Sequence, residues 1–112
     1  MPRYLISFDD GSMVFPEADL PQVAADSHAV VAEAKAAGVW IFGGGIDGPE
    51  VSVVGTDGTV ERNPYPASKP FVGGFSILEV PSHDEALAWA ARIAKACRCR
   101  QDVRAILFDP ES

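Results

Sequence analysis

Hydrophobic and polar positions alternate along this chain with two different periods. Residues 4–8 (YLISF), 39–42 (VWIF), 75–80 (FSILEV) and 103–108 (VRAILF) are short apolar runs that contain many β-branched and aromatic residues. Runs of this length and composition predict buried β-strands. Turn-forming residues, such as those in Asp9-Asp10-Gly11, interrupt the pattern between them.

Two longer segments follow the period of an α-helix instead. The first is expected from Pro21 to Ala37, with Gly38 as its C-terminal cap. The second is expected from Ser82 to about Cys97, where Ser82 can cap the helix start and Glu85 can complete a capping box. The predicted apolar faces are Val23, Ala24, Ser27, Val30, Val31 and Ala34 in the first helix, and Ala86, Leu87, Ala90, Ile93, Ala94 and Cys97 in the second. Both helices are therefore expected to pack on a sheet.

The segment between the second and third apolar runs contains turn signals and prolines. Residues 51–54 and 59–62 flank an Asp57-Gly58 pair, which predicts a β-hairpin with a two-residue turn. Residues 63–74 (NPYPASKPFVGG) carry three prolines and two glycines, so they predict a long, stiff surface loop. Loops of this length in small domains often carry function.

The order strand, helix, strand, hairpin, strand, helix, strand indicates one α+β domain over residues 1–112. It is typical of a ferredoxin-like split β-α-β fold, here with an inserted β-hairpin. Two helices cover only one face of such a sheet. Alternating positions are apolar on both faces, so we expect a second copy of the chain to cover the other face in a homodimer.

Composition and charge narrow the class of partner. The chain has 112 residues, 47% of them hydrophobic, and a formal net charge of -7 at pH 7. This charge argues against binding to nucleic acid or to anionic lipid, because both depend on clustered basic residues. The N-terminus lacks the pattern of a signal peptide and no apolar stretch is long enough to span a membrane, so a cytoplasmic location is expected.

Two further motifs are weak evidence for a cofactor. Cys97 and Cys99 are too close in sequence for good disulfide geometry, and His28 and His83 are the only histidines, so we expect free thiols and no metal site. Residues 43–48 (GGGIDG) match a dinucleotide-binding G-x-G-x-x-G pattern, but a strand-like VSVV follows instead of the helix that would hold the phosphates. We therefore expect no cofactor. The glycines are expected to let the strand bend or to let the backbone pass close to a neighbouring segment.

Residues 63–93 (NPYPASKPFVGGFSILEVPSHDEALAWAARI) carry a resemblance to a known family. The stretch resembles the DGPF-type branch of the YCII-related family. The resemblance rests on Lys69, which matches the lysine of the family's loop motif, on VGGF at 72–75 and on DEALAWAA at 84–91. Arg62, Ser68 and Pro70 replace an Asp, a Thr and a Glu of the family motif, so roles that depend on those side chains do not carry over.

The resemblance implies a dimeric α/β barrel and supplies no substrate. In the wider YCII group a His and an Asp are proposed to act as an acid-base pair, and one member is linked to dehydrochlorination of an aromatic compound. DGPF-type members are also often associated with extracytoplasmic-function sigma factors, which implies a regulatory setting.

His28 is the leading candidate for chemistry. It lies beside the apolar stripe of the first helix, and an imidazole can act as acid or base near neutral pH when a carboxylate orients it. Asp10, at the end of the first strand, and Asp47, after the glycines, are the candidate partners. The alternative is a half-exposed helix histidine that hydrogen-bonds to backbone.

A ligand cleft is expected between the first helix, the glycines and the proline-rich loop. Gly44 and Gly45 would allow close approach, Lys69 would bind an anionic group, and Tyr65 and Phe71 would form an apolar wall. The alternative for Lys69 is a solvated loop lysine.

Two functions remain open from the sequence. The first is a protein that binds a small molecule; if it is an enzyme, it is a cofactor-independent lyase or isomerase. In either case it should show a closed cavity with His28 near a carboxylate. The other is a non-catalytic interaction module in a sigma-factor-linked transcriptional response. It should show an isolated His28 and an exposed apolar patch around Tyr65, Phe71 or Trp89.

Overall fold

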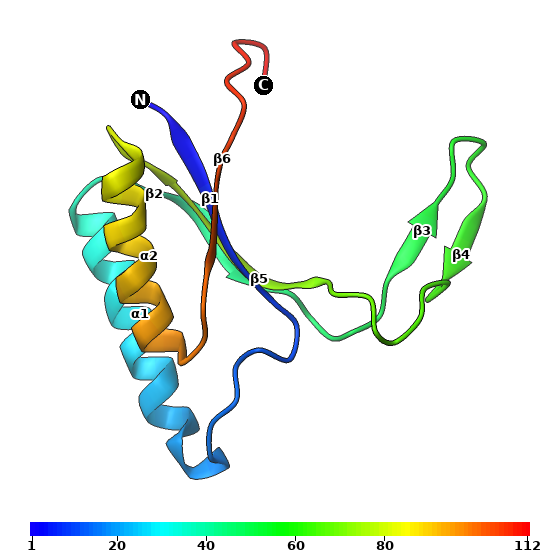
Figure 1. Ribbon diagram of the computed structural model, residues 1–112, viewed down its shortest axis with the longest axis horizontal. Helices are drawn as coiled ribbons and strands as arrows, with labels where there is room; N and C mark the ends of the chain where they lie inside the picture. Colours follow the sequence, from blue (N-terminus) through cyan, green and yellow to red (C-terminus); the bar gives the residue numbers. More distant parts are fainter.

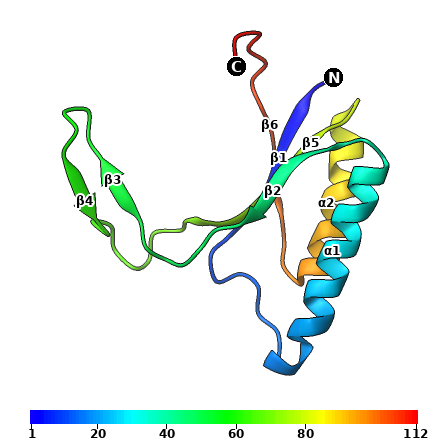
Figure 2. The same cartoon turned by 180° about the vertical axis from the view of Figure 1, so that it is seen from behind.

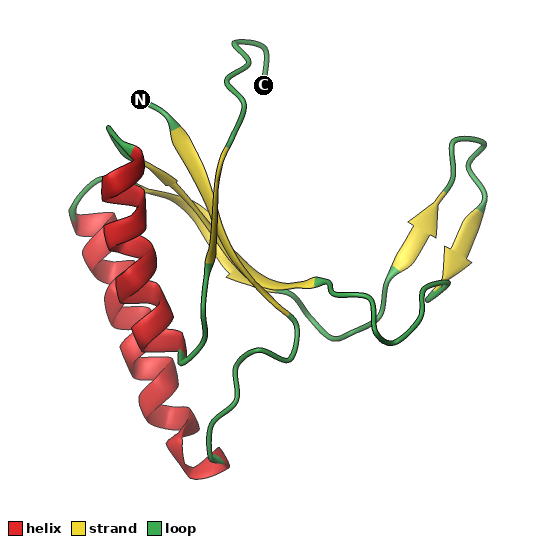
Figure 3. Cartoon of the chain, in the orientation of Figure 1, coloured by secondary structure: helices red, strands yellow, loops and turns green.

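The computed structural model describes residues 1–112 as two helices packed on one four-stranded sheet, with a separate β-hairpin (Figures 1 and 3). In chain order the elements are β1 (Arg3–Asp9), a 3-10 turn (Glu17–Asp19), α1 (Leu20–Ala36), β2 (Trp40–Gly45), β3 (Ser52–Val54), β4 (Val60–Arg62), β5 (Val72–Glu79), α2 (His83–Cys97) and β6 (Asp102–Ala105).

The main sheet has the order β2-β5-β1-β6, and every neighbouring pair is antiparallel. β1 and β2 therefore run in the same direction, with β5 between them and α1 as the connection. β5 and β6 are related in the same way, with β1 between them and α2 as the connection. This is the split β-α-β arrangement predicted from the order of elements, so the α+β fold class is confirmed.

Local signals place the helix ends. Ser82 is the N-cap of α2, and its hydroxyl accepts a hydrogen bond from the backbone N–H of Glu85 at 3.2 Å. Arg98 ends this helix in the left-handed conformation, with φ 59°. Gly38 follows α1 at φ 76°, as expected of a glycine after a helix.

The core lies between the helices and one face of the sheet. It is formed by the buried side chains Tyr4, Ile6, Leu78, Val80, Ala86, Ala90 and Ile93. Val23 and Ala34 of α1 are also buried, in agreement with the predicted apolar face of that helix. Trp40 and Trp89 are partly buried and pack against this core.

The opposite side of the sheet has no covering element, as predicted. Residues directly opposite each other in an antiparallel pair share a face, so Leu5 and Ile77 lie together, and Phe75 lies beside Ser7. Phe42 pairs with Ile77 and is 62% exposed. We call the side of the sheet that carries Leu5, Phe42, Phe75 and Ile77 the uncovered face.

Residues 46–71 form an arm that stands away from the rest of the chain (Figures 1 and 2). β3 and β4 form a two-stranded sheet of their own within it, with Val53 opposite Glu61 and Val54 opposite Val60. Backbone hydrogen bonds tie the base of the arm to the body, from Asp10 N to Phe71 O at 2.7 Å and from Ile46 N to Gly73 O at 2.9 Å.

Several predicted boundaries were wrong. β2 continues through Gly43 to Gly45, because these glycines pair in register with β5 rather than interrupting the strand. For the same reason β5 begins at Val72, three residues before the predicted start. The hairpin loop has three residues, Thr56 to Gly58, between Gly55 and Thr59, whose backbone N–H and C=O are hydrogen-bonded at 2.8 Å, and only Gly58 has a positive φ, so it is not a two-residue turn.

The final strand is also shorter than predicted. β6 ends at Ala105, and one more backbone hydrogen bond joins Ile106 N to Arg3 O at 2.9 Å. Leu107 and Phe108 then leave the sheet and are 90% and 86% exposed, because β1 offers no further partner beyond its first residues.

Candidate functional site

A cavity of about 540 Å³ lies between α1 and the β2–β5 side of the sheet. We call it the His28 cavity. Its lining residues are Phe8, Met13, Ser27, His28, Val30, Val31, Lys35, Trp40, Phe42, Gly43, Gly44, Gly45, Phe75, Ser76, Ile93, Ala96, Cys97 and Gln101. A volume of this size is in the usual range for small-molecule sites.

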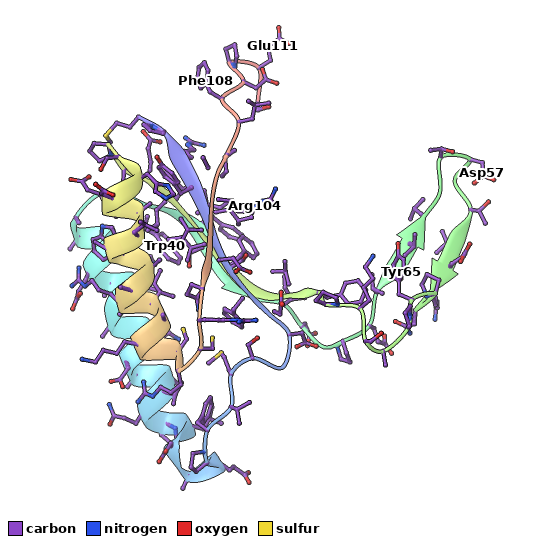
Figure 4. The ribbon with its side chains drawn as sticks, in the orientation of Figure 1. Trp40, Asp57, Tyr65, Arg104, Phe108 and Glu111 are labelled. Carbon is purple, nitrogen blue, oxygen red and sulfur yellow. The ribbon has the colours of Figure 1, made fainter.

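The walls of this cavity are largely aromatic. Phe8, Trp40, Phe42 and Phe75 all contribute, and the rings of Phe42 and Phe75 are tilted with centroids 5.9 Å apart. Figure 4 shows Trp40 between the sheet and the helices. Flat rings on several sides favour a small, planar, apolar ligand.

The polar groups of the cavity come mainly from one face of α1. Ser27, His28 and Lys35 line it from this helix, and His28 and Lys35 are seven residues apart, which is two helical turns. No Asp or Glu lines the cavity. Its ionisable groups are therefore a histidine, a lysine and the thiol of Cys97, a set suited to a ligand with acidic oxygens.

The glycines beside the cavity have two different roles. A Cβ at Gly43 would lie 2.5 Å from the backbone oxygen of Phe75, and one at Gly74 would overlap the Phe8 ring, so both positions are crowded. At Gly44 and Gly45 a Cβ would meet nothing within 4 Å. These two glycines leave space that a ligand or another chain can approach.

A second cavity, of about 430 Å³, lies at the base of the arm. We call it the Lys69 cavity; it is lined by Asp10, Pro49, Glu50, Val51, Asn63, Tyr65, Pro66, Ala67, Lys69, Pro70 and Phe71. Lys69 Nζ lies 3.6 Å from the centroid of the Tyr65 ring and 5.4 Å from that of Phe71. The exposed lysine thus makes two cation–π contacts with the aromatic rings of its own arm.

The structure divides the predicted site residues between the two cavities. His28, Gly44 and Gly45 line the His28 cavity, whereas Asp10, Tyr65, Lys69 and Phe71 line the Lys69 cavity. Asp47 is exposed just after β2 and lines neither.

The proposed His–Asp contact is not formed within one chain. His28 is exposed and makes no side-chain hydrogen bond, and in particular none to Asp10 or Asp47. Of the two features expected of an enzyme, the chain supplies the cavity with His28 but not the nearby carboxylate. Of the features expected of an interaction module, His28 is isolated from carboxylates within the chain and Tyr65 is 40% exposed, whereas Trp89 packs against the core.

Several cavity residues were not identified from the sequence. Lys35 could have been found from its spacing of two helical turns from His28. Phe8, Phe42 and Phe75 had been assigned to strands, but without the sheet order nothing indicated that they meet around one space. Gln101 lies in the loop before β6, where no periodic pattern places a side chain.

Asp26 helps to hold the helix that carries His28. Its carboxylate accepts hydrogen bonds from Gln22 Nε2 at 2.7 Å and from Arg98 Nη2 at 2.9 Å. The hydrogen bond from Gln22 and then that from Arg98 lower the pKa of Asp26 below its ordinary value. The second bond links α1 to the C-terminal end of α2, and the ion pair between Glu33 and Arg92 links α1 to an earlier turn of α2.

The two cysteines are free thiols, and Cys97 lines the His28 cavity. Cys97 Sγ lies 3.5 Å from Ser27 Oγ, and Gln101 Nε2 lies 3.4 Å from Cys99 Sγ. Burial, with a smaller contribution from the neighbouring Cys97, raises the pKa of Cys99 above its ordinary value. No group of three His, Cys, Asp or Glu side chains is arranged to hold a metal ion.

The raised pKa predicts that Cys99 reacts slowly with alkylating reagents. The thiolate is the reactive form, and burial keeps Cys99 protonated at pH values where a solvated thiol has begun to ionise. We expect iodoacetamide at pH 8 to modify Cys99 more slowly in the native chain than in the same chain unfolded in urea. Peptide mass spectrometry separates this site from Cys97 in a Cys97→Ser variant. Equal rates in the two states would contradict the prediction.

Comparison with known proteins relates the chain to a sequence family and to solved structures. The profile of the YCII-related domain matches residues 4–99. None of the curated proteins matches the sequence. No helix of the chain has the length and apolar character that crossing a membrane requires.

The structural match extends over the whole chain. It is to 5-chloro-2-hydroxyhydroquinone dehydrochlorinase from Burkholderia phenoliruptrix AC1100, determined in complex with 2,5-dihydroxybenzoquinone. The two chains share 19% sequence identity, the match covers 99% of this chain and 98% of the other, and the TM-score is 0.53. At this identity the comparison establishes a common fold.

Proposed function

Because this chain belongs to the YCII-related domain family, we propose that it binds a small, planar organic molecule with acidic oxygen substituents in the His28 cavity. One observation carries the proposal: a cavity of about 540 Å³ has aromatic walls and, on its α1 side, the cationic or ionisable side chains of Lys35 and His28. The dehydrochlorinase with the same fold was determined with such a molecule, 2,5-dihydroxybenzoquinone.

His28 is the proposed proton-transfer group. An imidazole that faces a bound ring can take a proton from carbon or oxygen, or return one, in an elimination or isomerisation. Lys35 would stabilise negative charge that develops on the ring oxygens. The activity would thus be that of a lyase or isomerase that needs no cofactor.

The proposed assembly is a homodimer. The uncovered face carries Leu5, Phe42, Phe75 and Ile77, and Phe42 is 62% exposed. Exposed apolar surface of this kind on a sheet is typical of an interface between subunits. In the homodimer, Asp10 and Asp47 remain the candidate carboxylates for His28, and Lys69 with Tyr65 and Phe71 remains the candidate anion-binding cluster.

A direct binding experiment tests the small-molecule function. In a Trp89→Phe background, Trp40 is the remaining tryptophan and lies in the cavity wall, so 2,5-dihydroxybenzoquinone should quench its fluorescence saturably. His28→Gln should weaken binding about tenfold, because a neutral amide replaces the ionisable imidazole and can form only a neutral hydrogen bond to an acidic oxygen of the ligand. His83→Gln is the matched control and should have no effect, since His83 does not line the cavity.

The alternative function, a non-catalytic interaction module, predicts a different outcome. Leu107 and Phe108 are almost fully exposed at the C-terminal tail, where Figure 4 shows Phe108 far from the helices, and such side chains favour a protein partner. Absence of saturable quenching, or equal affinities of the wild type and His28→Gln, would refute the small-molecule proposal and leave this alternative as the one to pursue.

A further inference from the structure

We propose that each His28 cavity is completed by the arm of a second copy, which packs on the uncovered face and closes the mouth of the cavity. This inference rests on the proposed function only for the identity of the ligand. Its geometry follows from the surface, the strand register and the arm itself.

One chain alone exposes more surface than a compact monomer does. Its accessible surface is 7871 Å², whereas a folded monomer of 11.9 kDa exposes about 5,900 Å². The excess of about 1,900 Å² is more than twice the roughly 800 Å² that each partner buries in a standard interface. The radius of gyration, 15.8 Å, also exceeds the value of about 13 Å expected for this length. The excess accessible surface is large enough to form an extensive interface with a second copy of the chain.

The cavity opens toward the uncovered face. Gly44 pairs with Phe75, and Phe42 pairs with Ile77. Paired residues share a face, so Gly44 and Phe42 lie on the uncovered face together with Phe75 and Ile77. Phe42, Gly44 and Phe75 nevertheless also line the His28 cavity. The cavity therefore extends around the free edge of β2, and a chain that covers this face beside β2 also covers the mouth.

The arm has the properties of a preformed binding element. Its tip is ordered by hydrogen bonds from Gly55 N to Thr59 O at 2.8 Å and from Thr59 N to Asp57 Oδ1 at 2.9 Å. Val54 and Val60 lie directly opposite each other and are 64% and 58% exposed. An isolated two-stranded hairpin is marginal in water, so this pair needs a surface to cover it. In a twofold dimer each arm would find that surface on the other copy.

Charge favours the same arrangement. The arm contains four acidic residues and two basic ones, Arg62 and Lys69. The His28 cavity contains His28 and Lys35 and no acidic residue. An arm with excess negative charge therefore complements the mouth of this cavity, and it can supply the carboxylate that His28 lacks within its own chain.

The test changes the arm without touching the cavity of the same chain. Val60→Asp places a charge on the exposed apolar pair, and Ala88→Asp places the same charge on the exposed side of α2 as a matched control. Three quantities are measured for wild type and variants: mass by sedimentation equilibrium, the NMR titration of the His28 ring, and quenching of Trp40 by 2,5-dihydroxybenzoquinone.

The expected result is a dimer for the wild type and Ala88→Asp. Val60→Asp should raise the dimer dissociation constant at least about tenfold, alter the His28 titration and weaken probe binding by a similar factor. A monomeric wild type overturns the inference. A Val60→Asp variant that stays dimeric also overturns it, and so does one that becomes monomeric while the titration of His28 is unchanged. If the wild type does not bind the probe, the proposed function fails, while mass and the His28 titration still decide the role of the arm.

A mixture of two defective variants distinguishes two possibilities: that the arm completes the cavity of the partner, or that it completes the cavity of its own chain. Gly45→Val is designed to fill the cavity of its own chain and keeps a normal arm. In a mixed dimer with Val60→Asp, the cavity of the Val60→Asp chain would receive the normal arm. Recovery of probe binding in up to one site per mixed dimer is expected, and no recovery would show that the arm does not complete the partner's site.

Discussion

Replacing Gly43 with alanine is expected to lower the free energy of unfolding by about 2 to 3 kcal/mol. The new Cβ would lie 2.5 Å from the backbone oxygen of Phe75 and 2.9 Å from the Cα of Ser76. Neither atom belongs to a flexible side chain, so relief requires β2 to move away from β5. That movement would disturb the β2–β5 pairing, which also forms one wall of the His28 cavity.

The neighbouring glycine provides the matched control. Gly44→Ala adds the same methyl group on the other side of the strand, where nothing lies within 4 Å. Its free energy of unfolding should equal that of the wild type or rise by up to about 1 kcal/mol, because alanine restricts the unfolded chain. Urea denaturation at one fixed protein concentration measures both variants. Equal stabilities for the two variants would contradict the assignment of Gly43 to a crowded position.

The elements of the fold could be predicted because local patterns and tertiary packing agree. The α1 segment combines a proline at its start, an apolar stripe and Gly38 at its end, and Ser82 precedes α2 as an N-cap. The order of these elements then restricts the topology to a few possibilities. The fold class therefore followed from the hydrophobic periodicity of the segments and from the order in which the strands and helices are connected.

The boundaries near the glycines could not be predicted, because strand pairing overrides local propensity there. Glycine has low strand propensity, yet Gly43, Gly44 and Gly45 of β2 pair in register with Ser76, Phe75 and Gly74 of β5. Gly43 and Gly74 are needed because the opposite strand and the Phe8 ring pass close to them. Such contacts join residues more than 30 positions apart in the sequence, so they leave no local signal in it.

The candidate site was predicted in part for a similar reason. His28, Gly44 and Gly45 meet because α1 crosses the sheet beside β2. Asp10 and Lys69 were grouped with them on the assumption that the proline-rich loop folds back over the same cleft. The structure instead extends that loop into the arm, so these residues form their own cavity. Whether the arm reaches a His28 cavity depends on a second copy, which a single sequence does not describe.

Replacing Gly45 with valine is expected to reduce the affinity for 2,5-dihydroxybenzoquinone at least about thirtyfold, or about 2 kcal/mol. Gly45 pairs with Gly74, whose crowded side is covered by the Phe8 ring, so a side chain at Gly45 would point toward the helix side of the sheet. Nothing lies within 4 Å of its Cβ position, and Gly45 lines the His28 cavity. A branched side chain there should occupy the space of the ligand while leaving the strand intact, because valine favours extended backbone.

Isothermal titration calorimetry measures this loss without relying on Trp40, whose surroundings the new side chain could alter. Ala88→Val adds a similar branched side chain on the exposed side of α2, outside the cavity, and should bind the probe within about threefold of the wild type. A thermal melt shows whether Gly45→Val remains folded. Binding of wild-type strength by a folded Gly45→Val chain would mean that the ligand does not lie against β2. The proposed site would then have to move to the Lys69 cavity, where Lys69 and Tyr65 offer the other combination of cation and aromatic surface.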